Sequence, residues 1–186
     1  MKRTVLVFGF ISGAVMAAML FSSIFFIDKI GFDRAEIVGY TSMVLAFLLV
    51  FFGIRSYREN VGGGAISFGR ALTVGLLIML ISTVCYVVAW EIVYFNFFHS
   101  FADKYAAHMV EQVRNSGASE QVIQAKLQEM KRFKELYENP FFNAAITFLE
   151  PLPVGLILTL ISAIILRKRS KSDNSPSNEQ ATVAAI

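Results

Sequence analysis

The segment from Ala71 to Phe98 is a nearly unbroken apolar run, and Glu91 is its one charged residue. A helix of this length, at a rise of about 1.5 Å per residue, crosses the hydrocarbon core of a bilayer, which is about 30 Å thick. The whole chain is 55% hydrophobic and only 17% charged, which is outside the ordinary range of soluble domains. We therefore predict a membrane protein in which the other apolar runs are neighbours of this helix.

Three further apolar runs are long enough to be membrane spans. They extend over about residues 4–27, 37–54 and 141–166. Mixed charges and a glycine between Asp28 and Glu36 predict a polar connection between the first two spans. Together with the run at 71–98, these segments predict four spans, with the lipid bilayer as the surroundings of the protein.

The first span carries two signals near its start. Lys2 and Arg3 precede it as in a signal peptide, but the run is longer than the core of a cleavable signal, so we interpret it as an uncleaved anchor. Gly9, Gly13 and Ala17 recur at a four-residue spacing within it. This spacing predicts a helix face without bulky side chains, which a neighbouring helix can approach closely.

Residues 101–139, between the third and fourth spans, are charged but keep apolar residues at helical spacing. The stripes comprise Phe101, Tyr105 and Met109, and then Ile123, Leu127, Met130 and Tyr137. A polar break at 115–118 separates them and predicts a helical hairpin. The predicted fold is therefore all-α: an integral membrane four-helix bundle over residues 1–169, with an extramembrane helical hairpin between its third and fourth spans.

The last span contains an interruption and is followed by a polar tail. Pro151 and Pro153 lie within the apolar run, and a proline removes a backbone hydrogen bond, so we predict a kinked helix. Residues 170–186 are rich in Ser, Asn and Gln and lack the apolar content of a packed core. We predict that they form a disordered cytoplasmic tail.

Basic residues adjoin the span ends on one side of the predicted membrane domain. With four spans both termini share that side, and the positive-inside rule assigns it to the cytoplasm. The residues expected to contact lipid headgroups there are Arg55, Arg58, Arg70, Arg167, Lys168 and Arg169.

Two carboxylates are the main candidates for chemistry within the membrane. Glu91 lies about 31 Å along its helix from Arg70, and Glu150 lies about 25 Å along the last span from Arg167. Ionisable groups at such depths are costly and mark functional sites. If the two converge, one can be held protonated by burial and by its neighbour, as a proton- or cation-handling site requires. The alternative, that each is a helix-end polar residue at the wet interface, stays open.

The remaining residues do not form a recognisable catalytic or metal motif. His99 with Asp103 and His108 with Glu111 have helical spacing, but two ligands do not make a metal site. No Ser, His and Asp occur in a hydrolase motif, so we expect neither an enzyme nor a cofactor. The basic residues adjoin spans and do not form one patch, which argues against nucleic acid as a partner.

The connection from Gly53 to Leu72 has the sequence GIRSYRENVGGGAISFGRAL. Together with the four-span plan and the charged hairpin, it resembles an uncharacterised family of bacterial membrane proteins, a domain of unknown function. The resemblance covers Thr4 to about Arg169. It implies a small bacterial inner-membrane protein and supplies no catalytic residues.

These observations favour a non-enzymatic accessory or interaction protein. The hairpin stripes and small-residue faces suit binding to a membrane partner or to a second copy. The alternative is a small proton- or cation-coupled transporter that uses Glu91 and Glu150. A third hypothesis is lipid handling at the face formed by Arg55, Arg58 and Arg70.

Overall fold

The computed structural model describes residues 1–168, except for the side chains of Phe25 and Asp28. Within these residues the regular secondary structure is helical, without strands. The helices are α1 (Lys2–Ile30), α2 (Phe32–Asn60), α3 (Phe68–Phe97), α4 (Phe101–Asn115), α5 (Glu120–Tyr137), α6 (Pro140–Leu149) and α7 (Leu152–Leu166). Arg169 and the tail predicted for residues 170–186 lie outside the described residues.

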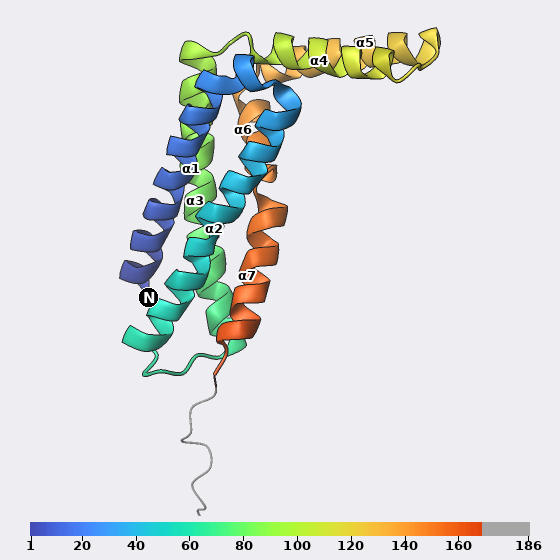
Figure 1. The fold of residues 1–186 in the computed structure, drawn as a ribbon. Coiled ribbons are helices and arrows are strands. Elements are labelled where there is room, and N and C mark those ends of the chain that lie inside the picture. The colour runs from blue at the N-terminus through green and yellow to red at the C-terminus, as the bar shows by residue number, and fades with distance from the viewer. Residues whose placement is uncertain (169–186) are drawn as a thin grey trace, which may run out of the picture.

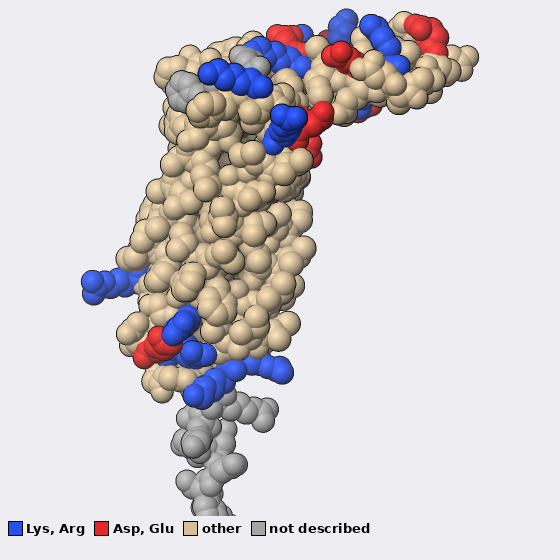
Figure 2. All heavy atoms as spheres, in the orientation of Figure 1, with Lys and Arg blue, Asp and Glu red and all other residues tan. Residues whose placement is uncertain are grey.

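Four segments of the described chain are long and apolar enough to cross a membrane. They are Lys2–Ile24, Phe32–Asn60, Phe68–Phe97 and Pro140–Leu166. Figure 1 shows them side by side as one bundle, with α6 and α7 together forming the fourth member. On the face drawn in Figure 2, charged side chains gather at the two ends of the bundle, and the middle is uncharged. The prediction of four spans is confirmed at the level of helix length and composition.

The connection between the first two spans is much shorter than predicted. Helix α1 continues to Ile30 and α2 begins at Phe32, so Gly31 alone joins them, with φ of 78°. Glycine adopts this positive φ without steric cost, which allows the chain to reverse at one residue. The predicted loop over Asp28 to Glu36 is therefore wrong. Polar residues near a helix end do not prevent helix formation where water is available, so these residues continue the two helices.

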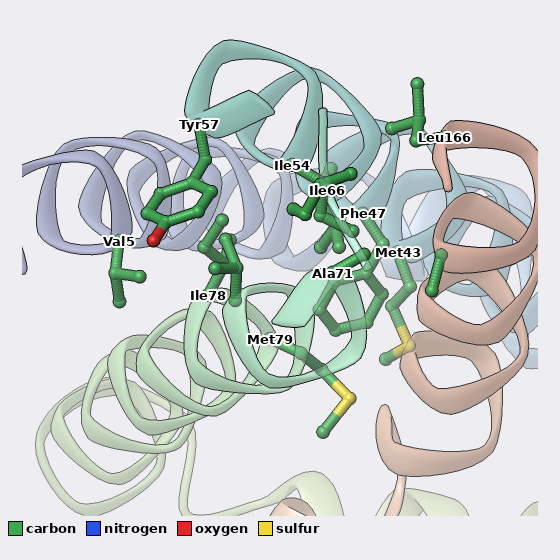
Figure 3. Close-up of a cluster of buried hydrophobic side chains, with 14 of the residues drawn as sticks. Val5, Met43, Phe47, Ile54, Tyr57, Ile66, Ala71, Ile78, Met79 and Leu166 are labelled. Atoms are coloured by element: carbon green, nitrogen blue, oxygen red, sulfur yellow. The ribbon is translucent and has the colours of Figure 1, made fainter. Parts of the chain in front are cut away.

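The core of the bundle lies between α2, α3 and α7. Helix α3 packs against α1, α2 and α7, and α2 packs against α1, α3 and α7. Fully buried side chains include Phe47 and Ile54 of α2 and Ile78 of α3. Figure 3 shows these side chains and Leu166 of α7, which belongs to the same buried cluster. The remaining faces of the four spans expose many large apolar side chains, as lipid contact requires.

Helices α1 and α3 approach closely at two glycines. A methyl group added at Gly9 would lie 2.8 Å from the Ile81 Cβ, and one added at Gly13 would lie 2.5 Å from the Cys85 Cβ. Both distances are too short for ordinary contact, so only glycine fits at these positions. Ala17, one turn further along, is half-buried. The four-residue pattern therefore lies where α1 meets α3.

The connection between α2 and α3 is fastened to the end of α7. Gly63 and Gly64 have positive φ values of 60° and 84° and turn the chain back toward the bundle. Ile66 and Lys168 exchange two backbone hydrogen bonds of 2.9 Å. The Ser67 hydroxyl then accepts a hydrogen bond from the Arg70 amide and caps α3.

Helices α4 and α5 pack against each other at the opposite end of the bundle. Figure 1 shows them lying across the bundle end and projecting sideways beyond it. We call α4 and α5 together the arm. Its position outside the membrane stays a prediction.

Candidate functional site

The fourth span is interrupted where α6 ends at Leu149 and α7 begins at Leu152. Pro151 and Pro153 have no amide hydrogen, so the carbonyls four residues earlier, those of Thr147 and Leu149, lose their helical partners. No other backbone hydrogen bond to these two carbonyls occurs among the described residues. We call this interruption, with Glu150 inside it, the helix break.

Glu150 joins the helix break to α3. Its Oε2 accepts a hydrogen bond of 3.2 Å from the Tyr86 hydroxyl. Tyr86 is only 8% exposed, whereas the Glu150 side chain is exposed on its other side. Glu36 and Tyr40 of α2 are close enough to the Glu150 carboxylate to interact with it electrostatically. The carboxylate is therefore held by α3 and faces α2.

The structure does not bring Glu91 to the same place. Glu91 follows Tyr86 by five residues, which puts it about 140° around α3 from the side chain that holds Glu150. Glu91 is half-buried, and its Oε1 has no hydrogen-bond partner among the described residues. Glu91 therefore points away from the face of α3 that holds Glu150, and the two carboxylates are not joined in one site.

A buried polar network lies directly above the helix break and anchors the arm. The Trp90 indole donates hydrogen bonds of 3.0 Å to the Tyr137 hydroxyl and to the Asn143 Oδ1. The Asn143 amide donates in turn to the Tyr137 carbonyl at 3.2 Å, and the Thr147 hydroxyl donates to the Asn143 Oδ1 at 3.3 Å. Asn143 is fully buried. The network therefore ties α3, the end of α5 and α6 together.

Burial raises the pKa of the Tyr137 phenol well above its ordinary value. The phenol therefore stays protonated at neutral pH, and the network carries no charge on this residue. Sequence reasoning treated Tyr137 as part of an apolar stripe and did not predict its hydrogen bond to Trp90. An amide such as Asn143 inside an apolar run was the signal that could have pointed to a buried polar network.

Helix α4 rests on the start of α2, next to the turn at Gly31. The Phe32 ring stacks on the His108 ring, with 5.2 Å between their centroids. The Asp33 Oδ1 lies 3.1 Å from the His108 Nε2 and accepts a hydrogen bond of 2.8 Å from the Gln112 amide. His108 therefore takes part in fastening the arm to the bundle.

An open cleft of about 580 Å³ runs between α4 and α5. Its lining includes Leu127 and Met130 together with charged side chains of both signs. Asp103 and Lys134 form an ion pair there, and this hydrogen bond raises the pKa of the Lys134 ammonium. Within residues 1–168, no group of three or more His, Cys, Asp and Glu side chains is arranged to hold a metal ion.

The predicted headgroup residues lie at the end of the bundle opposite the arm. Arg55 pairs with Glu59 at 3.0 Å, and the Arg58 guanidinium donates to the Leu166 carbonyl at 3.4 Å. Arg70 is exposed. Arg167 and Lys168 line a cavity of about 670 Å³ with residues 66–69. Figure 2 shows Lys and Arg side chains gathered at this end.

These features define a class: an all-helical membrane protein with four candidate spans, a broken fourth span and a helical arm at one end. Residues 7–168 match the family model described as "Protein of unknown function (DUF4199)", and the chain belongs to this family. Neither a curated protein nor a solved structure matches it.

Proposed function

We propose that this protein is a non-enzymatic accessory protein of a bacterial inner membrane, and that its arm binds a membrane partner. The observation that carries the proposal is the sideways projection of α4 and α5 beyond the bundle (Figure 1). An arm that overhangs the bilayer next to the bundle is in reach of whatever lies beside the bundle in the membrane. The partner is either a different membrane protein or a second copy of this chain.

The fastening of the arm supports this role. The Trp90 network holds the end of α5, and the contacts of Phe32 and Asp33 hold α4. A surface that is already held in one orientation loses less conformational entropy on binding than a flexible one does. The arm is therefore preorganised for a partner.

The surface of the arm has features of a contact surface. Val122 and Leu136 are 50% and 41% exposed, Leu127 in the cleft between α4 and α5 is 40% exposed, and charged residues of both signs surround them. Apolar side chains within a polar rim are typical of sites of protein association. The basic residues at the far end of the bundle support an orientation with both termini in the cytoplasm and the arm on the outer side.

The alternative of a proton- or cation-coupled transporter relied on Glu91 and Glu150 as a pair. Glu91 lies about 140° around α3 from Tyr86, the residue that holds Glu150, which weighs against that pairing. The accessory role therefore has the better geometric support.

Site-specific photocrosslinking in membranes tests the proposal. A photoreactive residue at Val122 on the arm is compared with one at Val61, which is equally exposed at 52% but lies at the other end of the bundle. We expect a discrete crosslinked product from Val122 and none from Val61. Its mass separates a second copy from a different protein, and either product supports binding through the arm.

A substitution that places a charge in the contact surface extends this test. Leu136→Glu is expected to reduce the Val122 crosslink about tenfold, because it places an unpaired charge in the interface. Val61→Glu is the matched control and should leave the crosslink unchanged. The absence of any Val122 product, or a product that Leu136→Glu does not affect, would contradict the proposal.

A further inference from the structure

We propose that the helix break binds a small, hard monovalent cation such as Na⁺, with the Glu150 carboxylate as its charged ligand. This inference is independent of the accessory role. It starts from the oxygen atoms that the break brings together, and it concerns occupancy of a site in the bundle, not transport.

The break supplies backbone oxygens that need a partner. Pro151 and Pro153 leave the carbonyls of Thr147 and Leu149 without their helical amides, and Pro151 is itself fully buried. A carbonyl in an apolar environment is costly unless a hydrogen-bond donor or a cation satisfies it. Broken membrane helices use such carbonyls as cation ligands where they line a cavity.

An unpartnered hydroxyl lies at the same level on α3. The antiparallel packing sets the register: Tyr86 bonds to Glu150, and Met79 lies against Gly155. Thr83 is between Tyr86 and Met79 on the same face of α3, which puts it opposite the residues just after Glu150. Thr83 is fully buried, and its Oγ1 has no hydrogen-bond partner among the described residues. Thr159 of α7 is also fully buried with an unpartnered hydroxyl among the described residues, but it lies against Gly75, away from the break. Thr83 is the one of the two at the level of the break, where a bound cation would supply its missing partner.

The donor set determines the kind of cation. The break offers one carboxylate from Glu150, the hydroxyls of Tyr86 and Thr83, and backbone carbonyls. All of these are oxygen ligands, which suit hard cations. A single carboxylate neutralises one positive charge, so the set favours a monovalent ion over Mg²⁺ or Ca²⁺. Glu36 of α2 adds a second negative charge nearby and attracts cations to the exposed side of Glu150.

Thermal unfolding of the purified full-length protein in detergent tests this site, with NaCl replacing choline chloride at constant ionic strength. Because Na⁺ binds the folded protein, we expect the melting temperature to rise with Na⁺ concentration and to saturate, by about 2–4 °C. Glu150→Gln should abolish this rise. Glu91→Gln, which changes a carboxylate on another face of α3, is the matched control and should keep it.

Thr83→Val separates ligation from folding. Without Na⁺, this variant should be no less stable than the wild type, since it replaces an unpartnered buried hydroxyl by a methyl group of the same shape. Its half-maximal Na⁺ concentration should rise about tenfold, because one ligand is lost. An unchanged Na⁺ response in Thr83→Val would overturn the place of this residue in the site.

Two results would overturn the cation site itself. The first is a wild-type melting temperature that does not depend on Na⁺. If this stability still depends on pH, Glu150 only titrates beside Tyr86, Tyr137, Glu36 and Tyr40, the groups that face it. The second is a Na⁺-dependent rise of equal size in Glu150→Gln.

Discussion

At the scale of single residues, buried amides and hydroxyls decide how the spans are joined. Trp90, Tyr137 and Asn143 form hydrogen bonds with one another, so their buried polar atoms have partners. Glu150 has one hydrogen bond, to Tyr86, and Thr83 has none among the described residues. The first group is a structural network, whereas the second is the site at which we propose that a cation binds.

Asn143→Ala tests the structural network. The substitution leaves the Trp90 indole and the Thr147 hydroxyl without their shared acceptor, so we expect a loss of about 1–3 kcal/mol in the free energy of unfolding. Reversible unfolding in mixed micelles measures it. Asn96→Ala is the control: Asn96 is exposed and bonds only to its own helix, so the expected change is within about 0.5 kcal/mol. Equal losses in the two variants would show that the network does not contribute as described.

The residue scale is also where sequence reasoning was least complete. Depth along a helix follows from counting residues, so Glu91 and Glu150 were predicted to lie at a similar depth. The rotation of one helix against another does not follow from counting, and this rotation puts the two carboxylates on different faces. Similarly, the apolar character of Trp90 and Tyr137 was visible in the sequence, but the long-range partners of their polar atoms were not.

At the scale of helices, sequence patterns predicted which face of a helix is packed better than they predicted which helix packs against it. The spacing of Gly9 and Gly13 predicted a face for close approach, and α3 is the helix that lies against it. The prolines predicted the interruption between α6 and α7. The turn at Gly31 was not predicted, because polar residues at a membrane boundary are compatible with both helix and loop.

Gly13→Val tests the contact between α1 and α3. The added side chain would overlap Cys85, and overpacking of this kind costs about 1–3 kcal/mol of stability. Gly39→Ala on α2 is the control, because no atom lies within 4 Å of the added methyl group. The control should be neutral or slightly stabilising, since alanine favours helix. If Gly13→Val proved as stable as Gly39→Ala in a thermal unfolding assay, the close approach of α1 and α3 would be wrong.

At the scale of the whole molecule, charge and shape support one account. The uncharged middle of the bundle separates an end rich in Arg and Lys from the end that carries the arm (Figure 2). The account therefore requires that the bundle crosses the bilayer four times and presents the arm on the side opposite to both termini. The accessory role depends on this placement, because the arm meets a partner only on the side where it lies.

Labelling of single cysteines with a membrane-impermeant maleimide in intact cells tests this placement most directly. Cys85 is the chain's one cysteine, so Cys85→Ser gives a cysteine-free background. New cysteines are then placed at Gln128 on the arm and at Gly69 beside the α2–α3 connection, both of which are exposed. We predict labelling of Gln128→Cys in intact cells and labelling of Gly69→Cys only after the cells are opened. Labelling of Gly69→Cys in intact cells, with Gln128→Cys protected, would contradict the account.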